Sequence, residues 1–267
     1  MPQIKSVDLP TGVTLQYAEQ GDPSGTPVLL LHGLADSFRS FDLVLPHLPG
    51  SIRALALTQR GHGDSSQPSD NYHYTHFVAD AAAFLDGLHI PAAVVVGHSL
   101  GCITAQRFAI DYPERTMALC LVAAAHRLAN TEAAQILRDV VAPIEGPVDQ
   151  AFAEGYQKST LARPVPPAFL ETVVRETMKV PAHVWRGVVA GFTRDDFSSE
   201  LHRITAPTLL VRGDQDEFAT QSDQEALLAA IPDSQLQVYE GTGHALHWEQ
   251  PERFATDLVS FIEEKVK

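Results

Sequence analysis

The chain has 267 residues, a formal net charge of −14 at pH 7 and a hydrophobic content of 45%. This length allows one large hydrophobic core with an insertion. The sequence contains no basic cluster, so we expect neither nucleic acid nor an anionic membrane as a partner. No apolar stretch reaches the 18 residues that a membrane-spanning helix needs, and residues 1–6 lack the apolar run of a signal peptide.

In chain order, apolar runs separated by glycine and proline predict an alternation of strands and helices. We expect strands at 13–20 and 28–32, a helix at 38–48, a strand at 52–57, a helix at 77–88, a strand at 92–96, a helix at 103–109 and strands at 118–122, 208–211 and 236–240. This spacing predicts a mainly parallel sheet that is covered on both faces.

Residues 126–202 interrupt the alternation. They contain four helical stretches, at 131–141, 148–158, 167–179 and 182–191, separated by prolines. We expect this insertion to form a helical cap over a core made of residues 1–125 and 203–267. Its aromatic residues are candidates for the wall of a largely apolar pocket, although each could instead pack the cap on the core; they include Phe152, Tyr156, Trp185 and Phe192. Three arginines are weaker candidates for binding a substrate carboxylate, namely Arg163, Arg186 and Arg194.

The segment Gly97-His98-Ser99-Leu100-Gly101 lies between a buried strand and a helix. In that context the pattern G-x-S-x-G predicts a nucleophile elbow, a sharp turn that presents the serine. Glycines suit the turn because a Cβ atom would clash there. Ser99 would then stand at the positive end of a helix.

A serine nucleophile needs a base, and the base needs an acid to orient it. His244 is the expected base because it follows the strand at 236–240 and a flexible turn; His247 competes with it. We expect His98 to pack or to make a supporting hydrogen bond.

Three acids follow the strand at 208–211: Asp214, Asp216 and Glu217. No carboxylate follows the strand at 118–122, so the later strand is expected to supply the acid. Asp216 is favoured because it comes three residues after Gly213, far enough to turn back, whereas Asp214 is expected to make Asx-type bonds to its own turn.

With these motifs the chain resembles the α/β-hydrolase fold proteins over nearly its whole length, except for about 126–202. The resemblance rests on the strand ending in His32-Gly33, the Arg60-Gly61-His62-Gly63 turn, Gly213-x-x-Asp216 and Gly243-His244. It departs from many members at Cys102, where they have glycine, and at Thr58, where they have aspartate. The resemblance implies an α/β fold with an eight-stranded, mostly parallel sheet and a helical cap. It also implies an oxyanion hole made by the backbone N–H groups of Leu34 and Leu100, with His32, His98 and Phe218 as further pocket candidates.

The resulting hypothesis is a serine hydrolase that cleaves a small, largely apolar carboxylic ester or lactone. Haloalkane dehalogenases and epoxide hydrolases are disfavoured because their nucleophile is a carboxylate. A carbon–carbon bond hydrolase or an enol-lactonase of aromatic catabolism stays open, as does a ligand-binding signalling protein of the same fold. Metal-binding and dinucleotide motifs are absent, so no metal and no cofactor is expected.

The two cysteines, Cys102 and Cys120, lie in segments predicted to be buried. We expect free thiols in a reducing compartment and therefore a cytoplasmic protein. The sequence leaves the physiological substrate and the oligomeric state open.

Overall fold

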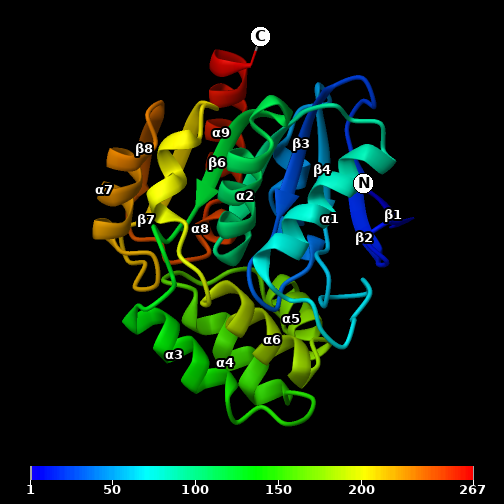
Figure 1. The fold of residues 1–267 in the computed structure, drawn as a ribbon, viewed down its shortest axis with the longest axis vertical. Helices are drawn as coiled ribbons and strands as arrows, with labels where there is room; N and C mark the ends of the chain where they lie inside the picture. Colours follow the sequence, from blue (N-terminus) through cyan, green and yellow to red (C-terminus); the bar gives the residue numbers. More distant parts are fainter. Residues whose placement is uncertain (1, 267) are drawn as a thin grey trace.

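The computed structural model describes residues 2–266. An eight-stranded sheet runs through the molecule in the order β1-β2-β4-β3-β5-β6-β7-β8 (Figure 1). The strands are β1 (Gln3–Asp8), β2 (Thr14–Gln20), β3 (Thr26–Leu31), β4 (Ile52–Leu57), β5 (Ala93–His98), β6 (Thr116–Val122), β7 (Thr208–Gly213) and β8 (Ser234–Tyr239). The strands from β4 to β8 in this order pair in parallel, whereas β2 pairs antiparallel with both β1 and β4. The predicted fold class, an α/β-hydrolase fold, is confirmed.

Helices cover both faces of this sheet. α1 (Tyr74–Gly87), α2 (Leu100–Asp111) and α7 (Gln221–Ala230) contribute to the apolar core on one face, and α9 (Pro251–Lys265) contributes to the core on the other. The central strand β5 is buried along its whole length. A rigid, covered strand therefore leads directly into Ser99.

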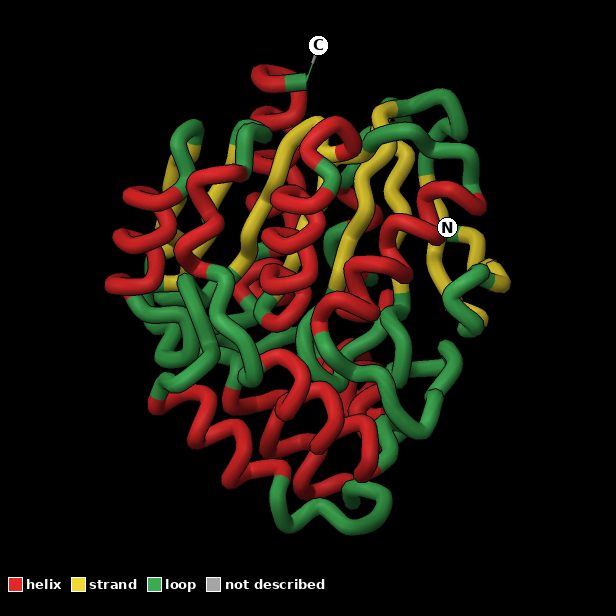
Figure 2. The backbone as a smooth tube through the Cα atoms, viewed as in Figure 1, coloured by secondary structure: helices red, strands yellow, loops and turns green. Residues whose placement is uncertain are grey.

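Four helices lie together beyond one end of the sheet (Figures 1 and 2). They are α3 (Glu132–Val141), α4 (Gln150–Ser159), α5 (Pro167–Met178) and α6 (Ala182–Phe192). They connect β6 to β7 and fall within the predicted insertion, at the end of the sheet where β5 passes into Ser99. We refer to these four helices as the cap.

The structure corrects the prediction of a helix at 38–48. That segment forms two 3₁₀ helices instead, Phe38–Phe41 and Leu45–His47. Pro46 explains the difference, because proline lacks the N–H that a continuous α-helix needs and clashes with the preceding turn. Among the elements that were not predicted are the edge strand β1 and the helices α7, α8 (Leu246–Glu249) and α9. The short helix α8 directly follows the predicted histidine loop.

Within residues 2–266, none of the helices combines the length and the apolar composition needed to span a bilayer.

Candidate active site

Ser99 occupies the sharp turn between β5 and α2. Its backbone has φ 54° and ψ −121°, a strained conformation that non-glycine residues rarely adopt. A Cβ atom on Gly97 would lie 2.5 Å from the Gly101 oxygen, and one on Gly101 would lie 2.3 Å from the Leu31 oxygen. Both flanking glycines are therefore required by close backbone approach, as the G-x-S-x-G pattern predicts.

The structure brings Ser99, His244 and Asp216 together from three separate loops. His244 Nε2 lies 2.8 Å from Ser99 Oγ, and His244 Nδ1 lies 3.0 Å from each carboxylate oxygen of Asp216. His244 is 8% exposed and Asp216 is 4% exposed. The three side chains form one continuous, largely buried hydrogen-bonded chain.

Asp216 is held as an anion in spite of its burial. Burial raises its pKa, but His244 and the backbone N–H groups of Ala219 and Phe218 outweigh that effect, so the pKa lies below its ordinary value. The two N–H groups donate to Oδ1, at 2.8 Å from Phe218 and 3.1 Å from Ala219. A carboxylate fixed in this way can orient His244.

Two backbone N–H groups are free near Ser99. Leu100 is the first residue of α2, so its N–H has no acceptor within the helix. Leu34 lies in the loop after β3, and among residues 2–266 its N–H donates to no backbone carbonyl oxygen. The carbonyl oxygen of Leu34 accepts a hydrogen bond from the hydroxyl of Tyr156 on α4, at 3.2 Å.

A cavity of about 250 Å³ opens over Ser99 and His244. Its lining includes the two expected oxyanion donors, Leu34 and Leu100, and two of the pocket candidates, Tyr156 and Phe218. The rest of its lining is mostly aliphatic and was not predicted: Ile103, Ala123, Ala125, Leu128, Ala133, Ile136, Leu137, Thr160, Glu217 and Ala219. The spacing of Ala133, Ile136 and Leu137 on α3 is the signal that could have identified its cap wall.

The family is decided by comparison with known proteins. A model of the alpha/beta hydrolase family matches residues 28–258. The chain belongs to this family. Among curated relatives, 3-oxoadipate enol-lactonase 2 of Acinetobacter baylyi is 27% identical and is matched over 91% of this chain and 90% of its own length. A non-heme haloperoxidase of Rhodococcus erythropolis is also 27% identical, over 98% of this chain and all of its own.

Solved structures of alpha/beta hydrolases superpose closely on this chain. A hydrolase from Pseudomonas aeruginosa has a TM-score of 0.85 at 25% identity, covering 97% of this chain and 98% of its own. An esterase from Exiguobacterium antarcticum has a TM-score of 0.87 at 20% identity, covering 98% of this chain and 100% of its own, which shows the shared fold.

Several predicted pocket residues do not line the cavity of this alpha/beta hydrolase. Phe152 and Trp185 pack edge to face with ring centroids 5.8 Å apart, and Trp185 is fully buried. Phe192 packs on Phe77 of α1 instead. These aromatic rings join the cap to itself and to the core, because their large apolar surfaces gain most from complete burial.

The two predicted pocket histidines have supporting positions instead. His32 is fully buried, its Nδ1 bonded to the Gly33 oxygen and its Nε2 accepting from Gln59 N–H. His98 Nε2 lies 3.3 Å from the carbonyl oxygen of His244, in agreement with the expected supporting hydrogen bond. Burial holds the pKa of both imidazoles well below the ordinary value, so both are neutral.

The competing candidates also have other partners. His247 is buried, and its Nε2 lies 3.2 Å from Ser40 Oγ. Asp214 does not bond to its own turn as expected. Its Oδ1 accepts from the N–H of Gly241 at 2.6 Å, which ties the acid loop to the histidine loop because both follow neighbouring parallel strands.

The cap arginines do not line the cavity. Arg163 donates to the carbonyl oxygens of Glu240 and Gly241 at 2.7 and 2.6 Å, and Arg186 donates to the Ile144 carbonyl. Arg194 is exposed beside Asp195. Their partners are therefore carbonyl groups and a neighbouring carboxylate.

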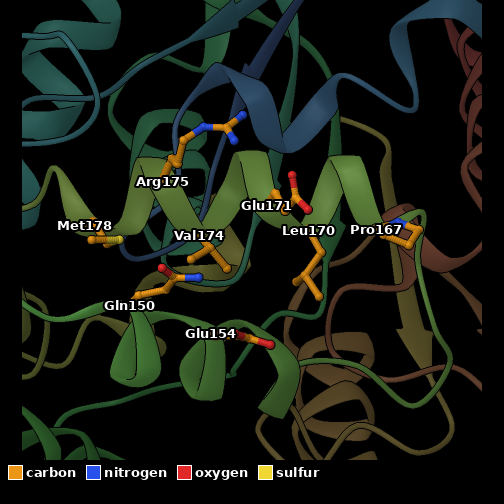
Figure 3. Close-up of a pocket in the computed structure, with 8 residues that line it drawn as sticks. All are labelled: Gln150, Glu154, Pro167, Leu170, Glu171, Val174, Arg175 and Met178. Atoms are coloured by element: carbon orange, nitrogen blue, oxygen red, sulfur yellow. The ribbon is translucent and has the colours of Figure 1, made fainter.

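A second hollow, of about 450 Å³, lies between α4 and α5 (Figure 3). Its lining shares no residue with the Ser99 cavity and includes Gln150, Glu154, Leu170, Glu171, Val174 and Arg175. Among residues 2–266, no group of three or more histidine, cysteine or acidic side chains is arranged to hold a metal ion.

Proposed function

We propose that this chain is a serine hydrolase that cleaves a carboxylic ester or lactone through an acyl-enzyme. The observation that carries the proposal is the hydrogen-bonded chain Ser99–His244–Asp216 at the base of a mostly apolar cavity. Along the chain these residues come in the order Ser99, Asp216, His244, which is typical of the family. A cytoplasmic location and a small-molecule substrate stay predictions from the sequence.

In the proposed reaction, Ser99 Oγ attacks the carbonyl carbon while His244 Nε2 takes its proton. The negative charge that develops on the carbonyl oxygen is stabilised by the N–H groups of Leu34 and Leu100. The tetrahedral intermediate collapses, the alcohol leaves with the proton from His244, and Ser99 is left acylated. Water then attacks the acyl group with His244 as its base, and the acid is released.

Asp216 has the supporting role in this scheme. It accepts a hydrogen bond from Nδ1 of His244, which leaves Nε2 free to accept the proton of Ser99. It also stabilises the imidazolium that forms during each transfer.

The decisive test is Ser99→Ala, assayed with p-nitrophenyl butyrate. Loss of the nucleophile is expected to lower kcat by about 10⁶-fold, as for other serine triads. Ser24→Ala is the matched control, because Ser24 is exposed on the loop before β3, at the opposite end of that strand from the cavity. An S99A enzyme that kept its activity would refute the proposal.

The enol-lactonase alternative is supported by the name of one relative. Turnover measured on a panel of simple esters, lactones and vinylogous diketones distinguishes three functions: a simple esterase, an enol-lactonase and a carbon–carbon bond hydrolase.

Slow or single turnover on the whole panel, together with a ligand-dependent protein partner, would instead favour a signalling protein. Activity that survives EDTA is expected, since the proposed mechanism uses only side chains and backbone N–H groups.

A further inference from the structure

A buried carboxyl group, that of Asp36, lies in the segment between β3 and the 3₁₀ helix Phe38–Phe41, which also carries the proposed oxyanion donor Leu34. We refer to this segment, residues 32–37, as the oxyanion loop. Asp36 is 3% exposed and follows Leu34 by two residues. Its Oδ1 accepts from Nε2 of Gln157 at 2.9 Å, and its Oδ2 lies at the long distance of 3.5 Å from Ser40 Oγ. Within residues 2–266, the basic side chain that approaches it to 4 Å is His98. An ionised carboxylate in this position would be poorly compensated.

The facing nitrogen of His98 is also without a partner. Nε2 of His98 donates to the carbonyl oxygen of His244, so Nε2 carries the ring hydrogen. The other ring nitrogen, Nδ1, therefore carries a lone pair. Nδ1 is buried, has no hydrogen-bond partner in the described part of the chain and lies 3.9 Å from Asp36 Oδ2. A proton on Oδ2 would satisfy both atoms after a small side-chain movement, whereas an ionised Asp36 would set two lone pairs against each other.

The surroundings determine which group keeps the proton. Burial raises the pKa of Asp36 to about 7, while burial and the neighbouring His247 and His244 hold the pKa of His98 well below its ordinary value. The titratable and polar groups around Asp36 come from every element packed against it: Ser40, His98, His244, His247, Tyr156, Gln157 and Glu176. Burial is the main effect that disfavours ionisation of Asp36, and Glu176 adds a smaller one, whereas Gln157, His244 and Ser40 favour it. Since the pKa of His98 lies far lower, the proton stays on the Asp36 carboxyl below about pH 7.

We propose that Asp36 is a positioning residue, a neutral carboxylic acid that donates through Oδ2 to His98 Nδ1 and accepts through Oδ1 from Gln157. This arrangement joins three parts of the molecule: the oxyanion loop, the end of β5 just before Ser99, and the cap helix α4. Its catalytic consequence rests on the proposed function, because it acts by fixing the Leu34 N–H.

The cap helix α4 contacts the oxyanion loop at two points through consecutive residues. Tyr156 donates to the Leu34 oxygen at 3.2 Å and Gln157 donates to Asp36 at 2.9 Å. Gln157 is itself held by Thr177 Oγ1 of α5, at 2.7 Å. With Asp36 protonated, the loop is fixed on both sides, by α4 and by His98. Such pre-positioning matters most when charge develops on the substrate oxygen, so it should affect kcat more than KM.

The test compares Asp36→Asn with Asp36→Ala. An asparagine reproduces the proposed arrangement, since its NH₂ can donate to His98 and its oxygen can accept from Gln157. We expect D36N to keep kcat within about threefold of the wild type, and D36A to lose about tenfold or more in kcat with little change in KM. Above pH 7 the wild type should lose activity as Asp36 ionises, and D36N should not.

Infrared difference spectroscopy gives a readout that does not depend on esterase activity. The wild type should show the C=O stretch of a protonated carboxylic acid that disappears as pH rises through about 7. The band should be absent in D36N and present in Asp233→Asn, a control at an exposed carboxyl before β8. The proposal is overturned if D36N loses as much activity as D36A, or if no such band is removed by D36N. Failure of the Ser99 test with the band intact would count against the proposed function alone.

Discussion

At the scale of single residues, two buried aspartates illustrate how surroundings determine charge. Asp216 receives two backbone N–H bonds and faces His244, and its pKa is lowered although burial opposes ionisation. Asp36 receives one amide bond and a distant hydroxyl, and burial raises its pKa to about 7. The number and quality of donors thus separates two carboxyl groups that are almost equally buried.

The raised pKa of Asp36 predicts a pH dependence of stability. In the unfolded chain this group ionises near its ordinary value of about 4. Between about pH 4 and 7 the folded state therefore binds more protons, so the free energy of unfolding falls as pH rises through that window and is constant above it. Asp36→Asn removes this decrease in the free energy of unfolding, because asparagine does not ionise. Urea denaturation should show D36N gaining about 2–4 kcal/mol relative to the wild type between pH 4.5 and pH 8. A difference that does not change with pH would contradict the raised pKa.

At the scale of elements, the position of Ser99 depends on how closely α2 approaches β3 and β5. The elbow glycines permit this approach, since a Cβ atom at either position would overlap backbone atoms. Cys102 continues the same contact: its Sγ lies 3.1 Å from the carbonyl oxygen of Gly97 and 3.2 Å from that of Val122, so its single S–H can donate to either oxygen or be shared between them. The Cys102 side chain thus connects the first turn of α2 with the strands β5 and β6.

A matched pair of glycine substitutions tests this packing. Gly101→Ala should lower the free energy of unfolding by about 2–3 kcal/mol and greatly reduce activity, because backbone atoms would have to move apart. Gly155→Ala, on the exposed face of α4 where a Cβ atom meets nothing within 4 Å, should instead stabilise the fold by about 0.5–1 kcal/mol. Chemical denaturation and ester assays measure both. Equal effects of the two substitutions would argue against close packing at the elbow.

At the scale of the whole molecule, charge should select among substrates. The chain carries a net charge of −14, and Glu217 contributes a carboxylate to the lining of the cavity. Among the described residues, no lysine or arginine lines it. An anionic substrate would therefore lose its hydration without gaining a cationic partner, and the field of the molecule would oppose its approach.

We accordingly predict that p-nitrophenyl butyrate is hydrolysed with a kcat/KM about 100-fold or more above that of the p-nitrophenyl monoester of succinic acid. The two acyl groups have similar length and differ mainly in charge. Added salt should lower the ratio of the two kcat/KM values because it screens the charges, and Glu217→Gln should lower that ratio at low salt. Equal rates on the two esters would show that charge does not select the substrate.

The sequence by itself determined the fold class and the three residues that the structure brings together at Ser99. These signals are local: apolar runs of strand or helix length, glycines at a sharp turn, and polar residues directly after strands. Parallel strands then bring their carboxyl ends to one edge, so Ser99, Asp216 and His244 meet there without further information. The segment at 38–48 shows the limit of periodicity, because a single proline replaced an expected helix by two short 3₁₀ turns.

Only the tertiary structure decided the lining of the cavity and the surroundings of Asp36. The aromatic residues of the cap were expected at the pocket, but Trp185 and Phe192 are buried in packing contacts and aliphatic side chains of α3 line the cavity instead. Asp36 and Gln157 are 121 residues apart in the chain, and no local pattern relates them. Contacts of this kind depend on how the cap seats on the sheet, because the position of each side chain follows from the packing of elements that lie far apart in sequence.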